Sequence, residues 1–355
     1  MKDIVLVAAN MENMYKNMHQ KLWNRLTGES LSDTWDKFEK YTYEIRNVFR
    51  LPCVQALSMH TIKRWSKTRI IYRFGSEMKW ELFDMASKMQ EDEDIPAQFL
   101  RLPYDAISIQ LEEDPTIEDM LMEMIGKLNE NFGMDTTMTI TTAKAGEICS
   151  KECIINVLTS PYGTYSLVLP IGNTIGDSMS AAMDFIENSP HWLAKDIRRS
   201  IKESEAYKNG DFDRDTYKDI IVSSLKWTIQ FILYLNAINS DQQKNEDRLK
   251  EDNVPRQKRK EIKRDIEKAR VQLIDVGYHV GKLIKQAKLK EEPEKQTAGP
   301  NKKGGKKRAH FRRAHWHHFW TGKRDGEQEL VLKWVQMTTI HEDEIDDKPT
   351  LMEVR

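Results

Sequence analysis

Hydrophobic residues recur every three or four positions along much of the chain, which is the spacing of one face of a helix. Residues 54–90 follow this pattern. In 216–239 the apolar positions surround nearly the whole circumference, which is typical of a central core helix. Alternating steps of four and three predict one long helix over 257–289. Gly277 and Gly281 lie one turn apart within it and indicate close approach of another backbone.

Shorter segments show the alternation or the β-branched content of strands instead. In the middle of the chain these segments are 106–111, 138–142, 154–158 and 165–169. Near the C-terminus, 311–320 and 329–339 flank a turn that ends at Gly326, an arrangement that favours a β-hairpin. The predicted fold class is therefore α+β: mostly helical, with a small central mixed or antiparallel sheet and a C-terminal β-hairpin.

Changes in composition divide the chain into five regions. They are an N-terminal helical region (1–53), an α+β body (54–290), a basic flexible linker (291–309), a basic hairpin rich in His and Trp (310–341) and an acidic tail (342–355). The linker is rich in Pro, Gly and Lys and has little apolar content. The two long helices, 216–239 and 257–289, belong to the body.

Charge is distributed unevenly in a chain whose formal net charge is only −1. Between Lys295 and Arg324 there are ten Lys or Arg, four His and two Trp residues, and no Asp or Glu. Cations beside exposed aromatic rings bind a phosphate backbone and stack on bases. Nucleic acid, with RNA first, is therefore the partner that this segment predicts.

Composition also argues against several other classes. Three cysteines provide no disulfide framework, so the expected location is a reducing cytoplasm. The most apolar segment, 220–238, contains too many polar residues for a membrane span. No phosphate-binding or dinucleotide-binding glycine motif and no nucleophile elbow is present. We therefore expect no membrane, no cofactor and no small-molecule substrate.

The predicted nucleic-acid contacts come from the linker and the hairpin. They are Lys306, Lys307, Arg308, Arg312, Arg313, His315, Trp316, His317, Trp320, Lys323 and Arg324. Arginine and lysine would contact phosphate, whereas Trp316 and Trp320 would stack on bases or pack on the body. Strand alternation places Trp316, His318 and Trp320 on one face, and His315 and His317 on the other.

Three alternatives remain open for the same segment. His315 and His317 have the spacing of two metal ligands on one strand, with His341 or Glu342 as a third ligand, although no second ligand cluster supports a metal site. The same two histidines, beside Arg313 and Lys323, have the residue types of a metal-free ribonuclease. The hairpin would otherwise bind an acidic protein surface without contacting RNA. The main prediction is a protein that is not an enzyme.

The hairpin also carries a specific family resemblance. The pattern His310-x-Arg-Arg-x-His-Trp-His-x-x-Trp-x-Gly322, followed by Lys333-Trp334, resembles the type V-A anti-CRISPR family called VA-two. Leu102-Pro-Tyr, Leu169-Pro-Ile-Gly and Val276-Gly-x-x-Val-Gly281 agree with it in the same order. The resemblance runs from about residue 55 to residue 341.

This resemblance implies a function that composition alone does not suggest. Members of the family come from phages and other mobile genetic elements and evade host defence. They are associated with recognition of the N-terminal polypeptide of a type V-A Cas nuclease during its translation, and with loss of its mRNA. The implied partners are that nascent polypeptide and, by our inference from the basic hairpin, RNA or the ribosome in the cytoplasm of the bacterial host.

Overall fold

The computed structural model describes most of the body and both strands of the hairpin. The described residues are 7–26, 53–90, 92–111, 139–148, 151–160, 163–188, 195, 198, 214–286, 310–312, 314–323, 326–336 and 338–340. The predicted linker (291–309) and acidic tail (342–355) lie outside these residues, as does the second half of the N-terminal region. Within the described part of the chain, no helix is both long enough and apolar enough to span a bilayer.

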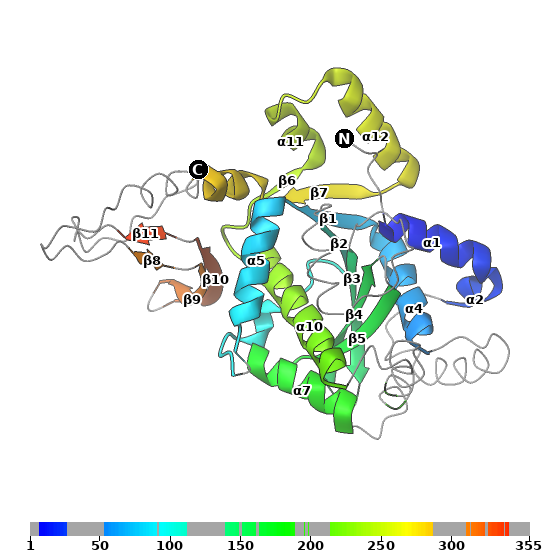
Figure 1. The fold of residues 1–355 in the computed structure, drawn as a ribbon, viewed down its shortest axis with the longest axis horizontal. Coiled ribbons are helices and arrows are strands. Elements are labelled where there is room, and N and C mark those ends of the chain that lie inside the picture. Colours follow the sequence, from blue (N-terminus) through cyan, green and yellow to red (C-terminus); the bar gives the residue numbers. More distant parts are fainter. Residues whose placement is uncertain are drawn as a thin grey trace, which may run out of the picture.

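A seven-stranded mixed sheet forms the centre of the body (Figure 1). Its strands are β1 (Ile70–Phe74), β2 (Ala106–Leu111), β3 (Thr139–Ile148), β4 (Lys151–Ser160), β5 (Gly163–Pro170), β6 (Gln242–Lys244) and β7 (Gln272–Val276). The order across the sheet is β5-β4-β3-β2-β1-β7-β6. β1 pairs in parallel with β2 and β7, and all other pairs in this sheet are antiparallel. The predicted α+β class is confirmed.

Helices cover both faces of this sheet (Figure 1). On one face lie α5 (Ser76–Lys88), α7 (Ile175–Asn188) and α10 (Arg214–Asn236). On the other lie α1 (Val7–Met18), α2 (Gln20–Arg25) and α4 (Cys53–Thr68). A short 3-10 helix, η2 (Ala97–Phe99), precedes β2, while α11 (Asn245–Glu251) and α12 (Arg256–Ala269) lie at the β6 edge.

The core is built around β1 and α10. Alternate residues of β1 serve the two faces: Ile70, Tyr72 and Phe74 join the main cluster, and Ile71 joins the cluster beneath α4 and α1. Phe231 of α10 lies edge-on to Phe74, with ring centroids 4.7 Å apart. Such aromatic pairs add to the stabilisation that burial provides. α10 thus occupies the position of a central helix, in the segment where the sequence predicted one.

The helical region predicted at 54–90 and the long helix predicted at 257–289 each contain a strand. The predicted helical region 54–90 is α4, then β1, then α5, and the predicted long helix over 257–289 is α12, then β7, then a further helical segment that begins at Tyr278. α4 and α12 each end at an arginine in the left-handed conformation, Arg69 and Arg270, both with φ of 55°. The prediction of a single helix over 257–289 was therefore wrong, because the β-branched residues after Arg270 pair with β1.

The two glycines after β7 do mark a close approach, as the sequence indicated. Gly277 has φ of +71°, and a Cβ atom there would lie 2.4 Å from Met78 Cγ. A Cβ atom at Gly281 would lie 3.3 Å from Glu77 Cβ. Both glycines therefore let the chain after β7 pack against the first turn of α5, which a larger residue at 277 would prevent.

His60 of α4 gives the body a measurable dependence on pH. Burial, together with the nearby Arg64 charge, lowers its pKa from 6.5 to about 4. Protonation of His60 therefore favours the unfolded chain. The free energy of unfolding is unaffected by His60 above pH 6.5 and falls as the pH decreases toward 4. Between pH 7.5 and pH 5 we expect this protonation to lower the free energy of unfolding by about 2 kcal/mol.

The measurement is urea unfolding of the wild type and of His60→Gln across this pH range. Between pH 7.5 and pH 5 the free energy of unfolding of the variant should fall by about 2 kcal/mol less than that of the wild type. Parallel pH profiles for the two proteins would contradict the assignment to His60.

Candidate nucleic-acid interface

The C-terminal hairpin consists of two antiparallel pairs of strands. β9 (His315–Gly322) pairs with β10 (Gln328–Val335), and β8 (His310–Arg312) pairs with β11 (Thr338–Ile340). Gly322 ends β9 with φ of +113°, and a Cβ atom there would lie 2.4 Å from the Glu327 carbonyl oxygen. The predicted hairpin is therefore confirmed, and its turn requires a glycine at the end of β9.

One face of the hairpin packs on the body. Trp334 is 2% exposed, and its ring meets Tyr234 of α10 edge-on, with centroids 5.8 Å apart. Trp316 lies opposite Trp334 in the ladder and donates from Nε1 to Gln230 Oε1 at 2.7 Å. Leu332 is fully buried in the same layer. Trp316 therefore packs on the body, which is one of the two roles predicted for it.

Backbone contacts fix the docking further. Asn239, just after α10, donates from Nδ2 to the Trp334 carbonyl oxygen at 2.8 Å and accepts from the Trp334 N–H at 3.0 Å. The Ile238 N–H donates to the Leu332 carbonyl oxygen at 2.9 Å. The Asn239 side-chain amide and the Ile238 backbone thus bind the backbone of β10 at the end of α10. The hairpin is thus held in one orientation relative to the body.

Aromatic and basic side chains remain exposed at the far end of the hairpin. Trp320 is 64% exposed, the largest exposure among the exposed large aromatic residues in the described part of the chain. Lys323 and His317 are exposed too, and the His317 ring stacks on Phe319 with centroids 5.3 Å apart. A ring in solvent beside a cation can stack on a base while the cation contacts phosphate.

The described residues therefore include only part of the predicted site. His315, Trp316, His317, Trp320 and Lys323 are described. Trp320 and Lys323 are exposed at the turn end of β9, and His317 is exposed on the opposite face of the strand from Trp320. The remaining predicted contacts lie outside the described residues; they are Lys306, Lys307, Arg308, Arg313, Arg324 and the side chain of Arg312. For all eleven residues the nucleic-acid role stays a prediction.

The two histidines of the enzymatic alternatives project from the same face of β9. His315 and His317 lie opposite Val335 and Lys333 in the ladder. Over the residues that the structure describes, no group of three or more His, Cys, Asp or Glu is arranged to hold a metal ion. The two residues alone define neither a metal centre nor a ribonuclease site, because a basic strand rich in histidine contains them by composition.

A second basic surface was missed by sequence reasoning. Lys244 and Lys250, at β6 and α11, face Arg256, Arg259 and Lys263 of α12 across a pocket of about 560 Å³. The single long helix predicted over 257–289 concealed it, because the pocket exists only where α12 ends and β7 returns into the sheet. The sequence signal that was available is the run of cations from Arg256 to Lys263.

Comparison with protein-family models identifies the class of protein. The family model described as AcrVA2-like, the anti-CRISPR type V subtype A2 family, matches residues 72–341. The match runs from β1 to the end of the hairpin, so the chain is an anti-CRISPR protein. Within that class it belongs to the AcrVA2-like family. The resemblance found in the sequence is thereby confirmed.

One solved structure and the curated proteins complete the comparison. The structure described as "Crystal structure of AcrVA2" is 12% identical in sequence, with a TM-score of 0.44, and the alignment covers 94% of this chain and 97% of that one. No curated protein matches the chain.

Proposed function

We propose that this protein recognises the nascent N-terminal polypeptide of a type V-A Cas nuclease and causes loss of the mRNA that encodes it. Membership of the AcrVA2-like family supports the anti-CRISPR role. The observation that carries the RNA half is the docked hairpin with Trp320 and Lys323 exposed at its far end. The protein acts without catalysing cleavage itself, in the cytoplasm of the bacterial host where nascent chains emerge.

The hairpin serves in this proposal as the contact to RNA or to ribosomal RNA. Trp316 and Trp334 on its inner face contact α10, so the exposed end of the hairpin is held in a fixed orientation relative to the body. This fixed position matters because a protein that links recognition of a peptide to loss of its message must hold its peptide-binding and RNA-binding surfaces at a constant separation. Arg312, Arg313 and Arg324 add phosphate contacts to those of Lys323.

The peptide-reading step is tested in a translating extract of the bacterial host. The message encodes the N-terminal segment of the nuclease ahead of a reporter. A matched message carries a one-nucleotide insertion after the start codon and a compensating deletion at the end of the segment, so the RNA is nearly unchanged and the peptide is altered.

With the protein added, we expect loss of the first message and survival of the second. Loss of both messages would mean that the RNA sequence is read. Survival of both would refute the proposed function.

The RNA contact is tested by the double substitution Trp320→Ala with Lys323→Ala. We expect affinity for an oligouridine probe to fall by about tenfold, because a stacking ring and a phosphate contact are lost. The slope of log affinity against log salt concentration should also decrease by the amount that corresponds to about one phosphate contact. Fluorescence anisotropy at several salt concentrations measures both quantities.

Tyr104→Ala is the matched control for this experiment. Tyr104 is an exposed aromatic residue, 42% exposed, in the loop before β2. Its replacement should leave RNA affinity unchanged. Equal losses in the two proteins, or no binding by the wild type, would count against the hairpin as the RNA contact.

A further inference from the structure

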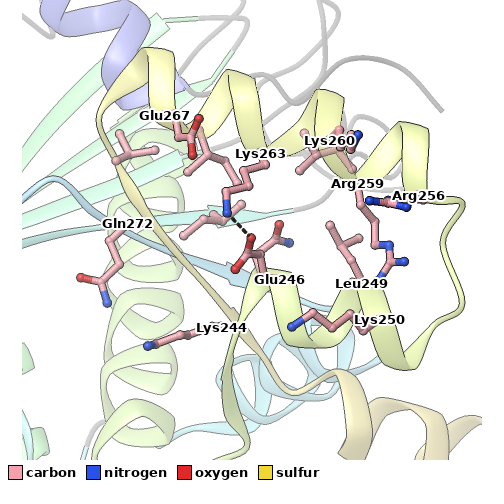
Figure 2. Close-up of a pocket in the computed structure, with 15 residues that line it drawn as sticks. Lys244, Glu246, Leu249, Lys250, Arg256, Arg259, Lys260, Lys263, Glu267 and Gln272 are labelled. Atoms are coloured by element: carbon pink, nitrogen blue, oxygen red, sulfur yellow. Dashed lines mark ion pairs between the residues drawn. The ribbon is translucent and has the colours of Figure 1, made fainter.

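The basic pocket at the β6 edge of the sheet has a floor of aliphatic side chains (Figure 2). Leu249 of α11, Ile262 and Ile266 of α12, and Val271 and Leu273 at β7 line it. Four of the five are buried, with Leu249 3% and Leu273 4% exposed. A concave apolar floor of this kind accepts aliphatic groups from a ligand. Among the described residues that line the pocket none is aromatic, so they provide no ring on which a nucleic-acid base would stack.

Cations surround this floor. Of the described residues that line the pocket, six are lysines or arginines and two are glutamates. Lys263 is paired with Glu246 at 2.7 Å, an ion pair that joins α12 to α11 across the pocket (Figure 2). Within the described part of the chain, Arg256, Arg259 and Lys260 make no ion pair. These three charges are therefore available to a partner that carries carboxylates.

Arg259 supplies a more specific indication. Its Nε atom is buried and has no hydrogen-bond partner among the residues that the structure describes. In Figure 2 its side chain reaches from α12 toward Leu249 and Lys250 of α11. A buried donor without a partner costs free energy, which a ligand acceptor placed there would recover. A guanidinium at the edge of an apolar floor fits a carboxylate bidentately, next to an aliphatic side chain.

Hydrogen bonds to neighbouring elements hold α11 and α12, the two helices that form the walls of the pocket. Asp275 of β7 accepts hydrogen bonds from Asn245 and Arg248 of α11, at 2.7 and 2.6 Å. Arg69 donates to the Ala269 carbonyl oxygen at the end of α12, at 2.8 Å. Because both helices are fixed before a ligand arrives, less ordering free energy is spent on binding.

We propose that this pocket binds an acidic polypeptide segment of a partner protein, with an aliphatic side chain on the floor and flanking carboxylates on Arg256, Arg259 and Lys260. Charge complementarity and the absence of stacking rings favour an acidic peptide over RNA. The site lies on α11 and α12, separate from the hairpin. The inference therefore goes beyond the proposed function and does not depend on it.

The test measures fluorescence anisotropy of two labelled probe peptides with the purified full chain. One probe is Glu-Asp-Leu-Leu-Glu-Asp, and the other has serines in place of both leucines. An oligouridine of equal charge is the third probe, measured on the Trp320→Ala, Lys323→Ala protein so that the hairpin contributes little. We expect the leucine peptide to bind about tenfold more tightly than either competitor, because only it fills the apolar floor.

Arg256→Gln with Arg259→Gln should weaken binding of the leucine peptide by about tenfold or more, since two charged hydrogen bonds are lost. Arg264→Gln is the matched control, because Arg264 is exposed on the same helix and does not line the pocket. Three results would each overturn the proposal: equal loss in the control, equal binding of the serine peptide, or tighter binding of the oligouridine.

Discussion

Replacing Asp275 with alanine is expected to lower the free energy of unfolding by about 3–5 kcal/mol, because it leaves buried cations without their counter-charge. Asp275 is 1% exposed in β7. Arg73 of β1 donates from Nε to Oδ1 at 2.8 Å, and Arg248 of α11 donates from Nε to Oδ2 at 2.6 Å. One carboxylate thus connects two adjacent parallel strands to the helix that forms a pocket wall.

The loss should exceed that of an ordinary ion pair for a structural reason. The Arg248 guanidinium also lies 4.2 Å from the centroid of the Tyr278 ring and 2.9 Å from Asp252. It cannot turn into solvent without giving up both contacts. With alanine at 275, the Arg73 side chain, only 9% exposed, stays buried and loses its main acceptor.

Urea unfolding with linear extrapolation measures this difference. Asp247→Ala is the matched control, since Asp247 is 56% exposed on α11 and pairs with Lys250 at 3.0 Å. An exposed pair of this kind contributes about 0–1 kcal/mol. If Asp275→Ala cost no more than this control, the ion-pair network would not be what holds α11 on the sheet. Affinity for the leucine probe peptide should fall together with the stability.

The sequence could predict those strands whose pattern is local. One predicted segment coincides with β2, and two others lie within β4 and β5, because alternation or β-branched content is visible in a few consecutive residues. β1 was missed for the opposite reason. All five residues of β1 are buried, since a parallel strand inside a sheet is covered on both faces and loses the alternation. Such a run is indistinguishable from a buried helix by its period alone.

The ends of the two helices were equally hidden. A helix commonly ends at glycine in the left-handed conformation, and this is the signal that a sequence offers. α4 and α12 end instead at Arg69 and Arg270, which adopt that conformation without being glycine. Arg69 is held there by tertiary contacts: its guanidinium bonds Glu12 of α1 at 2.7 Å, and its carbonyl oxygen accepts from the Gln272 N–H at 2.9 Å. No local pattern carries that information.

The candidate sites divide in the same way. The hairpin was predictable because its strands are adjacent and its composition is extreme. The face on which it docks was not, because Gln230 and Asn239 lie about a hundred residues earlier in the chain. The pocket on α11 and α12 required a break in a predicted helix, so its residues could not be assembled from the sequence. Asp275 would have been an unremarkable polar position on that helix.

Replacing Trp334 with alanine is expected to lower the free energy of unfolding by about 3–5 kcal/mol, the range for removing a large buried aromatic side chain. Its ring packs on Tyr234, and its Nε1 atom lies 3.3 Å from Met85 Sδ of α5. Because these contacts dock the hairpin, the variant should also expose Lys333 to trypsin at a lower denaturant concentration than in the wild type.

Trp320→Ala provides the contrast within the same hairpin. Trp320 is 64% exposed, so its removal should change stability by no more than about 0.5 kcal/mol while weakening RNA binding. Trp334→Ala, in contrast, should lower the stability of the protein. It should also allow peptide recognition without loss of the message, because the hairpin is no longer held in one orientation. If Trp320→Ala proved as destabilising as Trp334→Ala, the exposed ring would be a packing residue and the hairpin would lose its role as an RNA contact.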